Sequence, residues 1–487
     1  MNNKCCYLLI PCLAACAASG AQSVTLSVEE AIAQALERNF SIRIGRIEPE
    51  IAREAVRGAK GAFDPVITSE YNYERKEWSG ESVDEESASF RFGVGSTLPW
   101  GTRWEAALET NDRTTPFDPI TGSFGDNISS FAGIVVTQPV LRDFGLDGSY
   151  SEVRIARESS TAAWETFRAR VMDIVTATVE AYQNVYFARE NLRIAARNRD
   201  LALQLLEDNR KRVETGAMAP LDLVQAESEA ALREVSVISA RAFLRQARNA
   251  LRSLIWDDGG SVLELELEII PPENPDYFEP VLARDYGLAL QSRPEYLAAR
   301  AGLNIRQFEL RQIRRNALPR LDIVGSAGRL GIDDNLSDSI DATLDDGDPA
   351  YSIGAVFSMP FPNRSLNSEK TRAYLRRNQA ELTLQQLEQD IRLQLDDAAT
   401  RLNADWERIQ AARTARELAE KSLHAEEKKL QAGTSSTFVV LRLQGDLANA
   451  EIREINALAD YLVSLAQYDR VRGRILNRFN IRLQEMK

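Results

Sequence analysis

Two very long stretches of uninterrupted helical periodicity constrain this chain more than any other feature of its sequence. They cover residues 152–215 and 364–432, and each repeats small or apolar residues at alternating spacings of three and four. At a rise of ~1.5 Å per residue, helices of this length reach about 100 Å, well beyond the diameter of a compact domain. The many alanines in the repeats favour close packing against a partner helix. We therefore predict two long helices that project as antiparallel hairpins.

Each long stretch ends at a glycine that is followed by a new helical segment. The two stretches read "RVETGAMAPLDLVQAE" around Gly216 and "KLQAGTSSTFVVLRLQ" around Gly433. Glycine readily adopts the left-handed conformation that ends a helix, and Pro220 suits the first turn of the next helix. Both stretches are therefore predicted to be hairpin tips. The returning helices are expected over 219–256 and 437–475.

The same order of segments occurs twice along the chain, which indicates an internal duplication. In each half a helical segment, 29–61 or 285–318, leads to a proline at Pro65 or Pro319 and then to alternating, strand-like segments. A long helix, a glycine turn and a returning helix follow. The expected boundaries are a first repeat at 22–260, an equatorial strand and proline-rich linker at 261–280, and a second repeat at 281–487.

The first 21 residues have the features of a secretory signal peptide. Lys4 precedes a short apolar core and a run of small residues, and the apolar core is too short to span a membrane. Two processing sites compete. "LAAC" resembles a lipobox that would make Cys16 the lipidated first residue, whereas cleavage after Ala21 would suit ordinary signal peptidase. All four cysteines lie within the first 16 residues, so no disulfide is expected in the exported protein.

The composition argues against several classes of function. A net charge of −13 disfavours nucleic acid as a partner, because a phosphate-binding surface needs a basic face. The chain has a single histidine, His424, in a charged helical run. General acid–base catalysis and transition-metal binding usually draw on histidine. Because the sequence also has no recognisable triad or metal-ligand cluster, we predict no catalytic residue, no cofactor and no metal site.

Taken in order, the segments resemble the TolC-like outer-membrane efflux protein family (outer membrane factors). The resemblance rests on "AIAQALERN", on Pro65 and Pro319 before the strands, on "TQPVL" at 137–141, and on the doubled tips "VETG…PLDLVQAE" and "LQAGTSS". It covers almost the whole chain after the signal. It implies a fold that is mainly α with β: long antiparallel helical hairpins form an α-barrel tunnel, and strands contribute to one shared trimeric outer-membrane β-barrel.

The same resemblance implies a function and partners. A homotrimer would lie in outer-membrane lipid, extend through the periplasm, and meet an inner-membrane transporter through a periplasmic adaptor (membrane fusion) protein. It would be the passive exit duct of a tripartite efflux or type I secretion system, gated at the hairpin tips. Oligomerisation is also expected on physical grounds, because one chain has too few strands to close a barrel and lipid tolerates no open sheet edge.

The resemblance also indicates which residues form the gate and the adaptor contact. The best-known members carry acids a few positions after the second tip glycine, where this chain has Val439 and Arg442. Asp222 is the acid at the equivalent position of the first half, and Ser435 stands where members can place an arginine that pairs with it. Such a gate would be looser, or locked differently. The implied tip and gate residues are Gly216, Ala217, Asp222, Gly433, Thr434, Ser435, Val439 and Arg442.

Three points stay open at the level of sequence. The family's usual plan is two barrel strands per half, whereas the first half here offers four between Pro65 and Pro139, so an extra hairpin would lie inside the barrel wall or beside it. Residues 333–348 hold seven aspartates, and a solvated extracellular loop is favoured over a calcium site because EF-hand spacing is absent. A periplasmic adaptor or coiled-coil scaffold without a pore is the alternative function; the duplicated hairpins and proline-led strands favour the channel.

Overall fold

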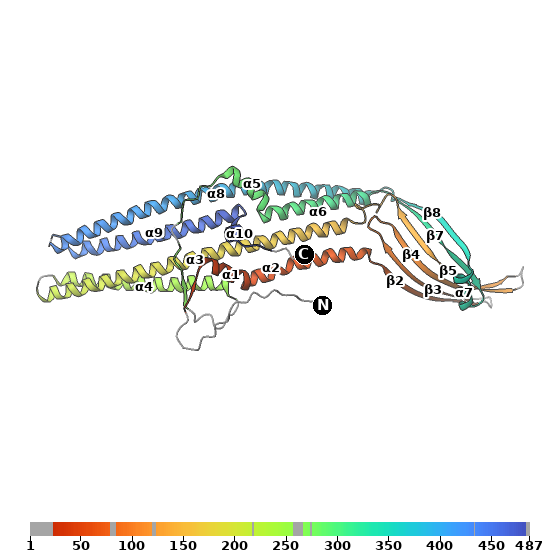
Figure 1. The fold of residues 1–487 in the computed structure, drawn as a ribbon, viewed down its shortest axis with the longest axis horizontal. Coiled ribbons are helices and arrows are strands. Elements are labelled where there is room, and N and C mark those ends of the chain that lie inside the picture. The colour runs from red at the N-terminus through yellow and green to blue at the C-terminus, as the bar shows by residue number, and fades with distance from the viewer. Residues whose placement is uncertain are drawn as a thin grey trace, which may run out of the picture.

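The computed structural model describes residues 23–77, 84–118, 123–216, 219–256, 266–272, 275–432 and 434–483. These residues form an elongated molecule in which a long body of helices carries a broad sheet at one end (Figure 1). The predicted export signal with Cys16, and the tip residues Ala217 and Gly433, lie outside the described residues.

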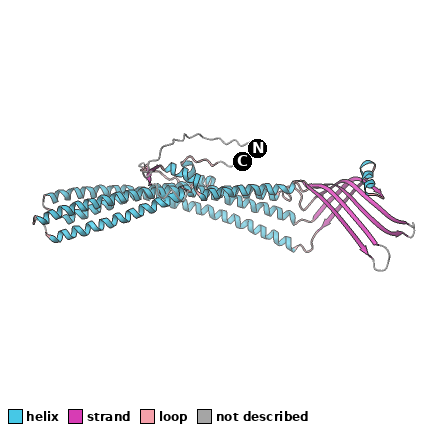
Figure 2. Cartoon of the chain, turned by 90° about the horizontal axis from the view of Figure 1, so that it is seen from below, coloured by secondary structure: helices cyan, strands magenta, loops and turns pink. Residues whose placement is uncertain are grey.

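Two long helical hairpins make up most of the body and confirm the main prediction. Each hairpin pairs a long helix with a shorter returning one, and all four run along the long axis of the molecule (Figure 2). At ~1.5 Å per residue the two long helices reach about 100 Å. Seam residues such as Val171, Val185 and Leu402 are buried against neighbouring helices. The hairpins consist of α3 (Ser151–Glu214) with α4 (Pro220–Ile255), and α8 (Arg364–Gln431) with α9 (Thr437–Val471).

The shorter helical segments are each broken once, at positions that were not predicted from the sequence. The first breaks at Asn39, whose side-chain oxygen accepts hydrogen bonds from the backbone N–H groups of Ser41 and Ile42 and so caps the second piece. The second breaks before Pro294, which occupies the first turn of a new helix. The pieces are α1 (Val28–Arg38), α2 (Phe40–Lys60), α5 (Leu282–Ser292) and α6 (Pro294–Asn316).

Asn39 also joins α2 to the end of α4, so that the two short helices together match the length of α3. Its side-chain Nδ2 donates to the carbonyl oxygen of Leu254 at 3.0 Å. Around this junction, Leu251 and Ile255 of α4 pack with residues of α1 and α3 in one apolar cluster. None of the described helices is both long enough and apolar enough to cross a membrane.

We predict that Asn39→Ala lowers the free energy of unfolding by about 2–4 kcal/mol, because it removes a helix cap and leaves the Leu254 carbonyl without its partner. Ser27→Ala is the matched control, since Ser27 caps α1 in an exposed capping box, and we expect it to cost about 1 kcal/mol. Thermal unfolding of the two variants in detergent measures the difference. Equal losses would contradict a special role for the α2–α4 junction.

A small parallel sheet lies beside this junction. It pairs β1 (Ser23–Leu26) with β6 (Glu266–Ile269). The hydroxyl of Tyr182 lies between the backbone oxygens of Leu26 and Ile270, at 2.9 and 2.8 Å, and burial raises its pKa to about 12. β6 lies within the segment 261–280 for which a strand was predicted, whereas its partner β1 was not predicted. A short helix, α10 (Ile475–Arg478), follows α9.

The large sheet contains six antiparallel strands, four from the first half and two from the second. Its order is β2-β3-β4-β5-β7-β8, so the extra hairpin of the first half lies within the sheet and not beside it. A 3-10 turn, η1 (Gly61–Phe63), connects α2 to the first strand. The strands are β2 (Val66–Glu77), β3 (Asp84–Thr97), β4 (Arg103–Asp118), β5 (Ser123–Pro139), β7 (Arg320–Asp333) and β8 (Asp348–Ser358).

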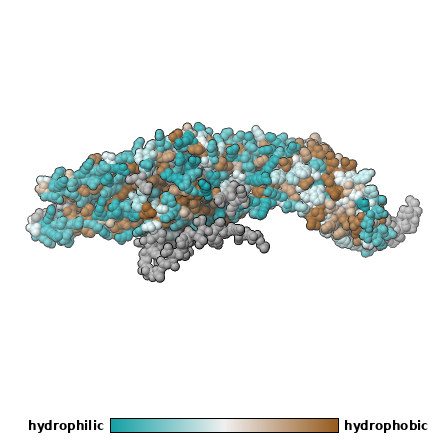
Figure 3. Space-filling view, viewed as in Figure 1, coloured by the Kyte–Doolittle hydropathy of each residue, from teal (hydrophilic) through white to brown (hydrophobic). Residues whose placement is uncertain are grey.

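The two faces of this sheet differ in polarity. Because side chains alternate along a strand, the register places apolar residues of all six strands on one side, which we call the apolar face, and mostly polar or small residues on the other, the polar face. Figure 3 shows hydrophobic residues gathering over the sheet, in contrast to the mainly hydrophilic helices. The apolar face includes the exposed residues Ile67, Tyr71, Phe90, Phe92, Ile134, Tyr351, Ile353 and Phe357.

The aspartate-rich segment 333–348 contains a helix, which corrects the predicted loop. α7 (Leu336–Asp345) packs on the apolar face at the end of the sheet far from the long helices. The buried Ser339 and Thr343, one helical turn apart, hydrogen-bond to Ser130 of β5. A Cβ on Gly331 of β7 would come within 2.5 Å of the Thr343 hydroxyl. Buried hydroxyl contacts thus hold a helix where charge alone indicated a solvated segment.

Candidate functional site

The first hairpin tip has the backbone conformation predicted for it. Gly216 adopts φ +77°, in the left-handed region that favours glycine, and its N–H donates to the carbonyl of Val213 at 3.0 Å. Pro220 begins α4, and Asp222 lies in the first turn of that helix. The tip therefore reverses the chain within a few residues at the end of the helical body opposite the sheet.

The second tip is closed by side-chain hydrogen bonds within its own hairpin. The Ser435 hydroxyl donates to Glu426 of α8 at 2.6 Å, and Thr434 donates through its N–H and its hydroxyl to the carbonyl of Lys429. Hydrogen bonds from Lys429 and Ser435 hold the pKa of Glu426 below its ordinary value. Glu426 therefore stays ionised at neutral pH, and this closure is lost only as the pH falls through the lowered pKa.

A groove of about 690 Å³ separates the two hairpins just behind the tips. α3, α4 and α9 form most of its walls, and charged residues of both signs line it together with Phe438, whose side chain is largely exposed. The predicted residue Arg442 lies exposed on this groove, whereas Val439 is half-buried in the first turn of α9. The charged lining residues are Arg212, Glu229, Arg233, Arg442 and Asp446.

Among the described residues near the tips, few polar side chains join the two hairpins directly. The Thr437 hydroxyl of α9 donates to the side-chain oxygen of Asn209 of α3 at 3.5 Å. The buried Nδ2 of Asn209 has no hydrogen-bond partner among the described residues. Gly445 of α9 lies against the guanidinium of Arg233 of α4, within 2.9 Å of where a Cβ would stand. The hairpin tips are therefore weakly joined to each other.

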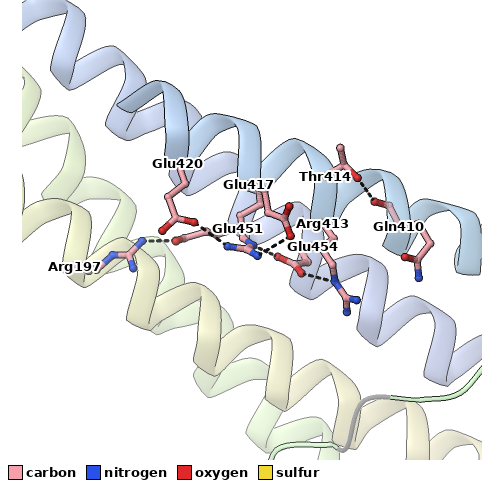
Figure 4. Close-up of polar contacts among 9 residues, drawn as sticks. Arg197, Gln410, Arg413, Thr414, Glu417, Glu420, Glu451 and Glu454 are labelled. Carbon is pink, nitrogen blue, oxygen red and sulfur yellow. Dashed lines mark hydrogen bonds and ion pairs between the residues drawn. The ribbon is translucent and has the colours of Figure 1, made fainter. Parts of the chain in front are cut away.

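Further from the tips, two glutamates of α9 form ion pairs with the helices on either side of it, α3 and α8, as Figure 4 shows. Glu451 forms an ion pair with Arg197 of α3, in the first hairpin. Glu454 forms ion pairs with Arg413 and Arg416 of α8, in the second hairpin. Glu451 stands fourteen positions after the start of α9 at Thr437, about 21 Å along the helix at ~1.5 Å per residue. We call Arg197–Glu451 the inter-hairpin pair.

The inter-hairpin pair was not predicted, because the arginine- and glutamate-rich helix faces indicate only a solvated surface. Its members are 254 positions apart in the chain. One signal was available: when the two tips are aligned, Glu451 matches Glu234 of the first half, although few other residues of the aligned stretches are identical. Glu234 in turn lies 3.6 Å from Arg199 of α3. Among the described residues, no group of three or more His, Cys, Asp or Glu is placed to hold a metal ion.

Comparison with known proteins relates this geometry to one family. The profile of the family described as "Outer membrane efflux protein" matches residues 31–255 and 286–474. The chain is 22% identical over 456 residues to the outer membrane efflux protein BepC of Brucella suis, covering 92% of this chain and 85% of the relative. It is 23% identical over 304 residues to the outer membrane protein TolC of Escherichia coli, covering 61% of each.

Solved structures share the fold. The outer membrane channel CmeC of Campylobacter jejuni superposes with a TM-score of 0.67 at 16% identity, covering 92% of this chain and 86% of that one. A structure of CusC superposes with a TM-score of 0.69 at 16% identity, covering 95% of both chains. Helical hairpins that carry a sheet at one end are therefore an arrangement that this chain shares with solved channels.

Proposed function

Since the chain belongs to the outer membrane efflux protein family, and is therefore an efflux channel of the outer membrane, we propose that three copies assemble into one channel-tunnel. The channel is the passive exit duct of a tripartite efflux or type I secretion system. Its sheet lies in the outer membrane, its helices extend through the periplasm, and a gate lies at the hairpin tips. The family is one of transport channels and not of enzymes, and we propose no catalytic step.

One observation carries the proposal: the large sheet has an apolar face, a polar face and two unpaired edges, β2 and β8. Lipid offers no hydrogen bonds to an open edge, so such a sheet is stable in a membrane only as part of a closed barrel. The apolar face then contacts lipid and the polar face lines the lumen. Because one copy leaves both edges open, the barrel must be shared between copies.

The helices support the same assembly. β2 continues from α2 and β8 leads into α8, so each sheet edge continues into one side of the helical body. Both sides expose apolar side chains that no described residue covers. Side-by-side contact of copies would bury these residues together with the sheet edges, and the resemblance to the family indicates three copies. They are Ile44, Ile47, Ile51, Leu232, Val235 and Ile238 on the α2–α4 side, and Leu375, Leu382 and Leu393 on the α8 side.

The tips and the groove behind them are the proposed contact for a periplasmic adaptor, which in turn binds an inner-membrane transporter. The groove offers charges of both signs and the exposed Phe438, a surface suited to the tip of a helical hairpin. The proposed adaptor and gate residues are Gly216, Ala217, Asp222, Gly433, Thr434, Ser435, Val439 and Arg442.

The proposed export signal ends either before a lipidated Cys16 or after Ala21, and mass spectrometry of the mature N-terminus distinguishes the two.

Single-channel conductance in a planar bilayer tests the proposal. We expect a small, discrete conductance from the purified protein and a larger one from Asp222→Ala, because removing an acid at the tip loosens the gate. Glu50→Ala is the control, since Glu50 is an exposed acid on α2 far from the tips, and should match the unaltered protein. No conductance from any of the three, together with extraction from membranes without detergent, would favour a scaffold that has no pore.

A further inference from the structure

The lumen wall of the large sheet is lined by small side chains along one complete row across its six strands. On the polar face, Thr68 pairs with Gly93, Gly93 with Ala107, Ala107 with Gly133, Gly133 with Gly328, and Gly328 with Ala350. The row runs from one unpaired edge to the other. The row therefore spans the whole lumen-facing width of the sheet of each copy.

The larger side chains beside this row lie along the wall. Phe131 packs against Gly133 and Gly328, with its ring atoms 2.5–2.8 Å from where a Cβ on either glycine would stand. The guanidinium of Arg91 forms ion pairs with Glu105 at 3.0 Å and with Glu109 at 3.6 Å, both on the neighbouring strand β4. Ion pairs between neighbouring strands and ring contacts with glycine keep these groups from the centre of the lumen.

The strand directions allow the sheet edges of separate copies to pair. β2 runs away from the helices and β8 runs back toward them, and they are of similar length, 12 and 11 residues. β2 of one copy and β8 of the next are thus antiparallel. Because each copy contributes an even number of strands, the same antiparallel pairing can form between every two neighbouring copies.

From these observations we propose that the outer-membrane barrel closes with eighteen strands and is about as wide as the helical tunnel below it. The size limit for cargo then lies at the hairpin tips and not at the exit. This inference rests on the homotrimer proposed above. It differs from the usual family plan of two strands per half.

The width follows from standard spacings. Eighteen strands about 4.8 Å apart and tilted by about 40° form a cylinder whose backbone diameter is about 36 Å. Twelve strands with the same spacing and tilt form one with a diameter of about 24 Å. Four helices per copy, α2, α3, α6 and α8, connect to strands of the large sheet and so lie at the sheet end of the body. Three copies therefore supply twelve helices, which at an interaxial spacing of about 9–10 Å form a ring with a diameter of about 36 Å. An eighteen-stranded barrel therefore continues the tunnel without narrowing.

Labelling of introduced cysteines from outside the cell tests the exit width. Thr137→Cys lies on the polar face near the helical end of β5, Ser129→Cys lies on the same face near the outer end, and Ile134→Cys lies on the apolar face. The probes are a small maleimide and a maleimide-polyethylene glycol about 20 Å wide, a size that an eighteen-stranded lumen admits and a twelve-stranded one excludes. The chain without introduced cysteines gives the background.

We expect both probes to label Thr137→Cys as fully as Ser129→Cys, and neither to label Ile134→Cys. If the small probe labels both polar-face positions but the wide probe labels only Ser129→Cys, the eighteen-stranded exit is wrong while the channel stands. If Ile134→Cys is labelled and Thr137→Cys is not, the assignment of the faces is wrong and the proposed channel fails with it.

Discussion

Glu451→Arg is expected to shift the closed channel strongly toward its open state. The substitution removes the inter-hairpin pair with Arg197 and places two positive charges where α9 meets α3. Partly exposed ion pairs contribute about 1 kcal/mol each. If three copies open together, the sum of about 3 kcal/mol changes the ratio of open to closed channels roughly 100-fold. Open probability in planar bilayers measures this ratio.

Two further variants make the test specific. The charge swap Arg197→Glu with Glu451→Arg restores the attraction and should return the open probability toward that of the unaltered protein. Glu454→Arg changes the same residue type three positions along α9, but the acid that it removes pairs with α8 of the same hairpin. It should alter stability with little effect on opening. Equal opening in Glu454→Arg and Glu451→Arg, or no restoration by the swap, would contradict the role of the inter-hairpin pair.

The dependence on salt gives an independent check of the same mechanism. Arg197 is about 42% exposed and Glu451 about 18% exposed, so dissolved ions screen the pair. We expect the unaltered channel to open more readily as the salt concentration rises, and Glu451→Arg to close more readily, because its repulsion is screened too. Packed helices tend to switch between discrete arrangements, so the conductance should change in steps.

The hairpins and tips could be predicted because their signals are local and long. The seam of α3 repeats over 64 residues, and the left-handed Gly216 ends it with a conformation that few other residues adopt readily. The four strands of the first half were also readable, since each shows alternation between turn signals. For these elements, neighbouring residues carry enough information to specify the local structure.

The features that were missed depend on partners far away in the chain. β1 is a four-residue strand whose partner lies more than 240 positions later. α7 forms in an aspartate-rich segment because Ser339 and Thr343 find buried partners on β5. Arg197 and Glu451 are ordinary surface charges until the fold brings α3 beside α9. Sequence patterns identify helices and strands, but not which charged faces meet when those elements pack.

Ile353→Arg is expected to abolish assembly in the outer membrane. Ile353 lies near the middle of β8, on the apolar face, and is 85% exposed in the single chain. A lipid-facing arginine near the bilayer midplane costs about 2–4 kcal/mol. Three copies would add up to about 6–12 kcal/mol, comparable to the total stability of many proteins. We expect the heat-modifiable trimer to disappear from the outer-membrane fraction.

Ser352→Arg is the matched control, because it places the same charge one residue earlier on the same strand. Ser352 lies on the polar face, where its hydroxyl is 2.8 Å from that of Ser326. Losing that hydrogen bond costs about 1 kcal/mol, and the new arginine would extend into water in the lumen, so the trimer should persist. If Ser352→Arg loses the trimer while Ile353→Arg keeps it, the assignment of the lipid-facing and lumen-facing sides of the sheet is reversed. Since alternate residues of a strand point to opposite sides, this neighbouring pair decides which face of the whole sheet contacts lipid.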